Sequence, residues 1–160
     1  MTPSSPQDVA VLNPLVLGLL TTVITIGVHA VELGATLQFV RRQYQFRRAG
    51  VGFWPDVGIM IGVILLALIA HLADVIIWAA LYVVCGEFTG FAFAFYHSEV
   101  NYTSLGYGDV VMSVSWRLLG PLEATDGLLM FGVSTAMIFA VMQRLFRTRV
   151  EATRGAHSGL

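Results

Sequence analysis

The sequence predicts an all-α membrane protein with three transmembrane helices and one short re-entrant helix. Hydrophobic residues make up 56% of the 160 residues and charged residues only 12%, whereas a soluble domain carries about 25% charged residues. The apolar residues are gathered into three runs, 15–40, 57–84 and 122–142. Each run reaches the roughly 20 residues that an α-helix needs to cross a bilayer. We therefore expect the bilayer to be the solvent for most of this chain.

A shorter apolar stretch, 88–96, lies between the second and third runs and is rich in aromatic residues. It is too short to span a bilayer as a helix. A segment of this length at membrane depth is typical of re-entrant or interfacial structure, because its backbone must be enclosed by protein or water. The sequence therefore predicts a re-entrant helix here.

The basic residues predict the orientation of the chain. Eight of the nine lie either between the first two runs or after the third, and Arg117 is the exception: Arg41, Arg42, Arg47, Arg48, Arg144, Arg147, Arg149 and Arg154. Positive residues favour the cytoplasmic side. Residues 1–14 are then an extracytoplasmic tail, 41–56 a cytoplasmic basic loop and 147–160 a short cytoplasmic tail. The N-terminus lies outside, and we expect a multi-pass protein of the plasma (inner) membrane.

Two function classes are disfavoured by the composition. The net charge is −1, which argues against a nucleic-acid partner because phosphate binding needs a basic excess. No nucleophile with an adjacent base stands out in the sequence, so we do not expect an enzyme.

The motif that stands out lies on the outer side, between the second and third runs. It consists of Thr103, Ser104, Leu105, Gly106, Tyr107, Gly108 and Asp109. This motif resembles the potassium-channel signature Thr-Val-Gly-Tyr-Gly-Asp, which follows a short pore helix. Residues 57–146 as a whole resemble the two-helix pore module of that family, with outer helix, pore helix, filter and inner helix. Run 15–40 is then an extra transmembrane helix.

The resemblance implies a homotetramer that conducts potassium ions passively through this filter. Potassium ions would bind at Ser104, Leu105, Gly106 and Tyr107, and no other cofactor is expected. The chemistry agrees, because rings of backbone carbonyls can replace the hydration shell of a cation. Glycine tolerates the backbone angles that such rings require, which accounts for Gly106 and Gly108.

The side chains around the filter also carry expectations. Leu105 and Tyr107 should point away from the ion path and pack behind the filter. Asp109 should hydrogen-bond the pore helix and attract cations. The irregular backbone cannot face lipid, so several copies of the chain must enclose it.

Four positions depart from the family pattern and leave the selectivity open. Ser104 replaces the usual threonine, Leu105 stands where valine or isoleucine is usual, and the aromatic pair of the pore helix is replaced by Tyr96 and His97. A cation channel of relaxed selectivity for potassium and sodium is therefore an alternative. So is a non-conducting pore-fold membrane subunit that serves assembly or sensing.

Further candidates lie beside the filter and in the third run. Glu99 would brace the filter from behind together with Tyr96, or it would face a subunit interface. Gly127 and Gly132 are candidates for a gating hinge in the inner helix or for close helix packing.

Four ionisable residues fall inside the first two runs, as pairs at i,i+3 spacing: His29 with Glu32, and His71 with Asp74. Ionisable residues at membrane depth are functional candidates. Three interpretations remain open: a structural hydrogen-bonded cluster, a proton sensor, and a metal site built from histidine and carboxylate ligands.

Overall fold

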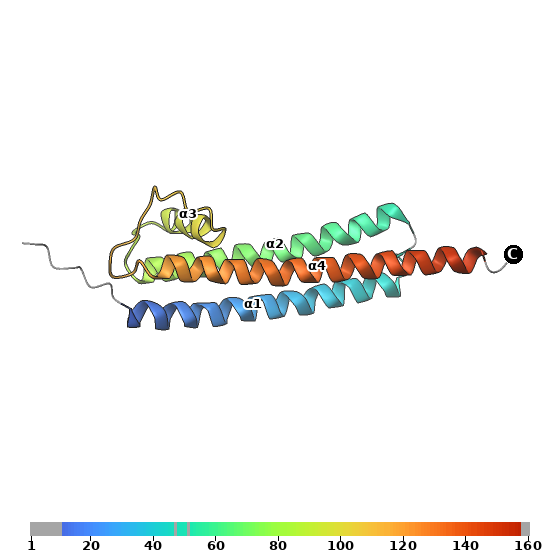
Figure 1. The fold of residues 1–160 in the computed structure, drawn as a ribbon, viewed down its shortest axis with the longest axis horizontal. Helices are drawn as coiled ribbons and strands as arrows, with labels where there is room; N and C mark the ends of the chain where they lie inside the picture. The colour runs from blue at the N-terminus through green and yellow to red at the C-terminus, as the bar shows by residue number, and fades with distance from the viewer. Residues whose placement is uncertain (1–10, 47, 51, 158–160) are drawn as a thin grey trace, which may run out of the picture. The chain divides into compact units, whose positions relative to one another are not determined.

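The structure is a computed structural model that describes residues 11–46, 48–50 and 52–157. Within these residues it contains four α-helices and no strand (Figure 1): α1 (Leu12–Gln45), α2 (Phe53–Val84), α3 (Phe91–Tyr102) and α4 (Leu119–His157). The helices α1, α2 and α4 are long and apolar enough to cross a membrane, whereas α3 is too short. The predicted all-α membrane fold is confirmed.

Each long helix carries a proline as its third residue: Pro14, Pro55 and Pro121. Proline is tolerated there because the first turn of a helix has no intrahelical acceptors for its amides. Because α1 begins at Leu12, the last three residues of the predicted tail 1–14 are helical. Residues 1–10 of that tail lie outside the described residues.

The predicted loop 41–56 is mostly helical. α1 continues through Gln45, and α2 already begins at Phe53. The prediction followed the apolar residues, but arginine and glutamine are good helix formers, so a helix can continue where its apolar run ends.

α4 shows the same effect at its C-terminal end. It runs to His157, so the predicted tail 147–160 is largely helical. The helix thus continues well beyond the apolar run that predicted it.

α3 begins at Phe91 and ends at Tyr102, later than the predicted stretch 88–96. The prediction stopped where polar residues begin. Two of these, His97 and Ser98, are only 5% and 0% exposed, so they belong to the packed face of the helix. The predicted end of the helix was therefore wrong, because polar residues were taken to mark its end although they are buried.

The chain divides into two compact units. Unit 1 comprises Met1–Val28 and His71–Met130, and unit 2 comprises His29–Ala70 and Phe131–Leu160. In unit 1, α3 lies against the adjoining parts of α2 and α4 (Figure 1), and the core is built from large buried side chains that include Val75, Trp78, Tyr82, Tyr102, Leu119 and Met130. Unit 2 has its own core, which includes Val40, Ile59, Val63, Ala67, Met137, Val141 and Leu145.

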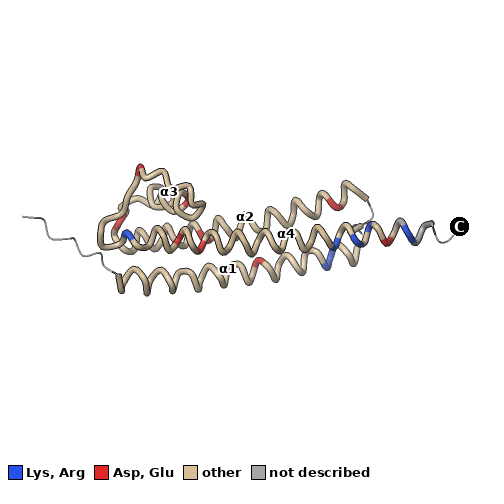
Figure 2. The backbone as a smooth tube through the Cα atoms, viewed as in Figure 1, with Lys and Arg blue, Asp and Glu red and all other residues tan. Residues whose placement is uncertain are grey.

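In unit 2, the basic residues of α1 and α4 lie near one another (Figure 2). The guanidinium of Arg144 lies 4.9 Å from the ring centroid of Tyr44 in a cation–π contact. Arg149 forms an ion pair with Asp56 at the start of α2. The two basic segments predicted to share one side of the membrane therefore meet in this unit, although Arg47 lies outside the described residues.

Candidate functional site

The segment that follows α3 stays hydrogen-bonded to the last turn of that helix. The amide of Ser104 donates to the carbonyl oxygen of Asn101 at 2.8 Å. The amides of Leu105 and Gly106 donate to the carbonyl oxygen of Val100 at 3.0 and 3.2 Å. These bonds satisfy carbonyl groups that the end of a helix leaves without intrahelical partners. They also turn the amide side of the segment toward α3.

The backbone φ angles of this segment alternate between the right-handed and the left-handed region. The φ angle is −78° at Thr103 and positive at Ser104 (58°), Gly106 (56°) and Gly108 (73°). No other non-glycine residue in the described part of the chain has a positive φ. Alternation of this kind turns consecutive amides to one side of the chain. The carbonyl groups then face the opposite side, away from α3.

The left-handed backbone at Ser104 is the feature of the segment that the sequence did not predict. Gly106 and Gly108 adopt the left-handed conformation at little cost. An L-residue with a side chain costs about 1–2 kcal/mol in that conformation. A non-glycine residue held there is often part of a functional site, because the surrounding structure must offset the strain.

The segment is open on the side away from α3. Within the part of the chain that the structure describes, the carbonyl oxygens of residues 103–108 accept no hydrogen bond. Leu105 and Tyr107 are 54% and 67% exposed. The packing of these two side chains behind the segment therefore stays a prediction.

Asp109 is tied to α3, as expected. The hydroxyl of Tyr96 donates to Oδ2 of Asp109 at 2.7 Å. This bond is the main reason why the pKa of Tyr96 lies above its usual value. It joins the first half of α3 to the end of the segment, so both ends of residues 103–109 are held by the same helix.

The two glycine candidates in α4 differ in their surroundings. A Cβ atom on Gly127 would lie 2.1 Å from the carbonyl oxygen of Tyr102, whereas nothing lies within 4 Å of a Cβ on Gly132. The end of α3 therefore approaches the α4 backbone more closely than a side chain at position 127 would allow. Close packing accounts for Gly127, while the space around Gly132 is open.

Among the described residues, the side chain of Glu99 makes no hydrogen bond to the segment that it was expected to brace. Its Oε2 atom is buried and has no hydrogen-bond partner among the described residues. Its backbone carbonyl accepts a bond from the hydroxyl of Thr103 at 2.7 Å. The contact of Glu99 with the segment is therefore made by its backbone.

Comparison with known families matches this region. Residues 70–144 match the ion channel family. The match begins in α2 and covers α3, the alternating segment and much of α4. It supports the interpretation of this membrane-spanning chain as an ion channel. No curated protein and no solved structure matches the chain significantly.

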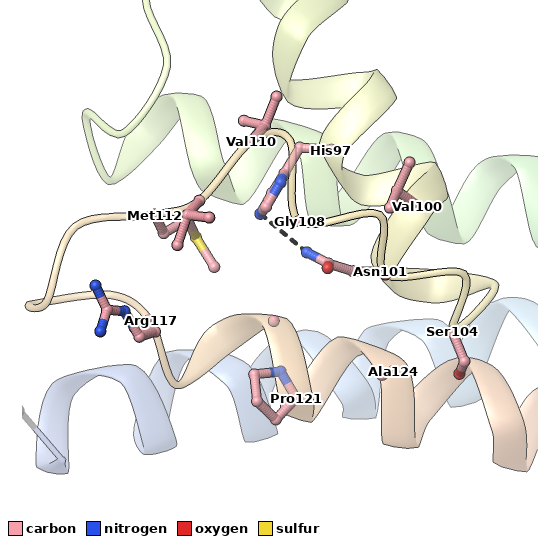
Figure 3. Close-up of a pocket in the computed structure, with 13 residues that line it drawn as sticks. His97, Val100, Asn101, Ser104, Gly108, Val110, Met112, Arg117, Pro121 and Ala124 are labelled. Carbon is pink, nitrogen blue, oxygen red and sulfur yellow. Dashed lines mark hydrogen bonds between the residues drawn. The ribbon is translucent and has the colours of Figure 1, made fainter.

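A cavity of about 380 Å³ lies beside the segment in this ion channel region (Figure 3). It is lined by residues of α3, the segment, the connection that follows the segment and the start of α4, among them Ser104, Arg117 and Pro121. At its wall, Nδ2 of Asn101 lies 2.9 Å from Nε2 of His97. An amide nitrogen can only donate, so this His97 nitrogen accepts and carries no proton. Burial lowers the pKa of His97, against the opposing effects of Asp109 and Glu87.

One predicted ionisable pair meets a residue that the sequence had not singled out. The hydroxyl of Tyr102 donates to Oδ2 of Asp74 at 2.8 Å and lies 2.9 Å from Nδ1 of His71. Since that hydroxyl donates to the carboxylate, Nδ1 of His71 is the donor in the second contact. The pair on α2 therefore holds the last residue of α3.

The other predicted pair lies in unit 2. Glu32 accepts a hydrogen bond from the hydroxyl of Thr36 at 2.9 Å, one helical turn along α1. His29 is 3% exposed. The four residues of the predicted cluster are thus divided between the two units.

Sequence analysis missed two acids at the start of α4. Glu123 and Asp126 are 0% and 1% exposed. Asp126 accepts hydrogen bonds from the indole of Trp78 and the hydroxyl of Thr25, both at 2.8 Å to Oδ2. The carboxyl group of Glu123 is hydrogen-bonded to the hydroxyls of Tyr82 and Ser98. The sequence could have indicated these two acids, since they are ionisable residues at i,i+3 spacing inside an apolar run. Unlike the other two pairs, they include no histidine.

Proposed function

We propose that this chain forms the pore of a homotetrameric potassium channel that conducts ions passively through residues 103–109. The observation that carries the proposal is the alternating backbone of this segment. It presents a row of unpaired carbonyl oxygens on one face, and such a row is the ligand set that a dehydrated monovalent cation needs. The ions are proposed to bind at Ser104, Leu105, Gly106 and Tyr107.

The charges around the segment favour a cation over an anion. α3 ends where the segment begins, and the C-terminal end of a helix carries a partial negative charge. Asp109 lies exposed at the other end of the segment. Both features lower the energy of a cation on the carbonyl face, which supports the proposed ion class.

The exposed side of the segment supports assembly into a tetramer. A single chain leaves Leu105 and Tyr107 more than half exposed next to unpaired carbonyl groups. Such a backbone cannot face lipid, because lipid offers no hydrogen bonds and no ion hydration. Neighbouring copies around a fourfold axis would cover these side chains and close a ring of carbonyl groups.

Orientation and gating are part of the same proposal. The basic residues of α1 and α4 lie together in unit 2, and the positive-inside rule favours the cytoplasmic face of the plasma membrane for that end. The N-terminus would then lie outside. Gly132 is the proposed gating hinge, because close packing already accounts for Gly127.

A second candidate function is a cation channel of relaxed selectivity, and Ser104 favours it. In the described structure this residue adopts a left-handed backbone with φ of 58°. Thr103 and Ser104 supply the first oxygen ligands of the proposed filter, so a strained residue here would change their spacing. Potassium and sodium would then be distinguished less strictly.

Flux from purified protein in liposomes tests the proposal. We expect a potassium gradient to drive flux and the reversal potential to follow potassium. Equal permeability to sodium would support the second candidate function. Gly106→Ala should abolish flux, because alanine disfavours the left-handed backbone at φ 56°. Gly34→Ala is the matched control, since its Cβ meets nothing within 4 Å and its φ is not left-handed. A tetramer without ion flux would contradict the proposal.

A further inference from the structure

The side chain of Glu123 joins three helices inside unit 1. It projects from the first turns of α4 and is fully buried. Its Oε2 contacts the hydroxyl of Tyr82 on α2, and its Oε1 contacts the hydroxyl of Ser98 on α3. The Ser98 hydroxyl also lies 2.9 Å from the carbonyl oxygen of Val75 on α2. Two of these three oxygen–oxygen contacts involve the carboxyl group of Glu123, and the third joins Ser98 to the backbone of α2.

These three contacts require three hydrogens, and the neighbours supply two. Tyr82 has one hydroxyl hydrogen, Ser98 has one, and the Val75 carbonyl has none. If Glu123 were ionised, the single Ser98 hydrogen would have to serve two acceptors, and one contact would bring two lone pairs together. If Oε1 carries a proton, Glu123 donates to Ser98, Ser98 donates to Val75, and Tyr82 donates to Oε2. Every contact then contains one hydrogen.

The groups that face Glu123 also disfavour a charge on it. Tyr82 faces it from α2, Ser98 and the amide of Asn101 from α3, and Asp126 from one turn further along α4. These neighbours include hydroxyls, an amide and a second acid, but no basic side chain of the described residues contacts it. A buried carboxylate without a paired cation is costly, so such a group usually takes up a proton.

We propose that Glu123 is a proton-binding site whose neutral carboxylic acid positions α3, and with it the start of the segment 103–109. This proposal rests on the proposed channel function for its effect on ion flux. Loss of the proton would leave the single Ser98 hydrogen to serve both Glu123 and Val75, and it would place a charge in the core of unit 1. α3 would then lose one of the two hydrogen bonds that Ser98 makes to α2 and α4, and the carbonyl row that begins at its C-terminus would lose alignment. Glu123 is thus a positioning residue that acts through Ser98.

Infrared spectroscopy of the purified protein tests the proton without any ion flux. The carbonyl band of a protonated carboxylic acid should be present at neutral pH and absent from Glu123→Gln. Asp126→Asn is the matched control, because it removes a neighbouring buried acid and should leave the Glu123 band in place. If Glu123→Gln shows the same acid bands as the wild type, the site holds no proton and the proposal is wrong.

The pH dependence of flux tests the positioning role. Buried glutamates can titrate as late as about pH 9, so flux is measured between about pH 6 and about pH 10. We expect wild-type flux to fall about tenfold over this range, the change that follows from loss of one buried hydrogen bond. Glu123→Gln should keep its flux, because its amide donates to Ser98 at every pH. An identical pH profile in the two proteins would overturn the positioning role.

Tyr82→Phe keeps the proposal testable if Glu123→Gln does not fold. A hydrogen bond donated to a carboxylate favours the ionised form. Removal of the Tyr82 hydroxyl should therefore shift the pH midpoint of the Glu123 infrared band upward, and a downward shift or no shift would contradict the assignment. The infrared readout remains valid if no variant conducts ions, so failure of the channel proposal is distinguishable from failure of the proton site.

Discussion

Replacing Gly127 by alanine would place a methyl group against the carbonyl group at the end of α3. The added Cβ would lie 2.1 Å from the Tyr102 oxygen and 3.0 Å from the Tyr102 carbonyl carbon. Close carbon–oxygen contacts have a separation of about 3.3 Å. The α4 backbone and the end of α3 must therefore move apart by roughly 1 Å. The obstacle is backbone, which cannot rotate away as a long side chain would.

The expected cost follows from two opposing effects. Overpacking of a well-packed core costs about 1–3 kcal/mol, and a backbone obstacle favours the upper end of that range. Alanine in a helix gains up to about 1 kcal/mol over glycine. We expect a net destabilisation of about 2 kcal/mol, which is a loss of roughly 30-fold in the folding equilibrium. Ion flux should fall too, because the displaced residue directly precedes Thr103.

Unfolding of the purified protein in detergent, followed by tryptophan fluorescence, measures the effect, with liposome flux as the second readout. Gly132→Ala is the matched control for the unfolding measurement, since a Cβ there meets nothing within 4 Å. Its unfolding midpoint should stay the same or rise. If Gly127→Ala unfolds at or above the midpoint of Gly132→Ala, the close approach of α3 to α4 is not present in the protein.

Three further outcomes follow from the contacts around the segment and in unit 2. Tyr96→Phe removes the 2.7 Å bond to Asp109 and should reduce flux several-fold while the unfolding midpoint changes little, because the bond is exposed; an unchanged flux would show that the bond does not hold the segment. Arg149→Met leaves the carboxylate of Asp56, 8% exposed, without its ion partner. Because the Arg149 side chain is 37% exposed and the pair is partly screened by solvent, the midpoint should fall by the equivalent of about 1 kcal/mol, whereas the double variant with Asp56→Asn should recover part of this loss. Burial lowers the pKa of His97, so the folded state resists protonation of this side chain. The stability of the fold should therefore decrease as the pH falls below about 6.5. In thermal unfolding measured on both sides of that pH, His97→Gln should weaken the dependence of the midpoint on pH.

The helical architecture could be predicted from apolar runs because length and hydropathy are properties of the sequence alone. The positions where helices end could not. α1 continues through charged residues to Gln45, and α3 continues through buried polar residues to Tyr102. In both cases the boundary depends on whether a polar residue faces protein or water, and that information is absent from an apolar run.

The candidate segment was found because glycines mark where backbone angles are unusual. Gly106 and Gly108 were predicted for that reason and do have positive φ. Ser104 has the same left-handed conformation, which its residue type did not predict. Tyr102 was not predicted either, because its role depends on where α2 places Asp74, which lies far away in the sequence.

The polar contacts of α3 explain why so many buried acids occur in an otherwise apolar protein. Between transmembrane helices the hydrophobic effect is weak, since lipid tails are as apolar as leucine, so close packing and hydrogen bonds must supply the specificity. The hydroxyl of Tyr102 donates to Asp74, and the hydroxyl of Ser98 meets Glu123. Both ionisable partners lie on the long helices and both hydroxyls lie on α3.

Directional bonds therefore set the position of α3 together with the burial of its inner face, and this has a consequence for substitutions. Apolar replacements on the outer face of α3, such as Phe93→Leu at a side chain that is 66% exposed, should leave its position unchanged. Removal of a single bonded hydroxyl should move the helix, because the buried acid that remains must find another donor or a proton. Since the segment 103–106 is hydrogen-bonded to the last turn of α3, any such movement is transmitted directly to the carbonyl row.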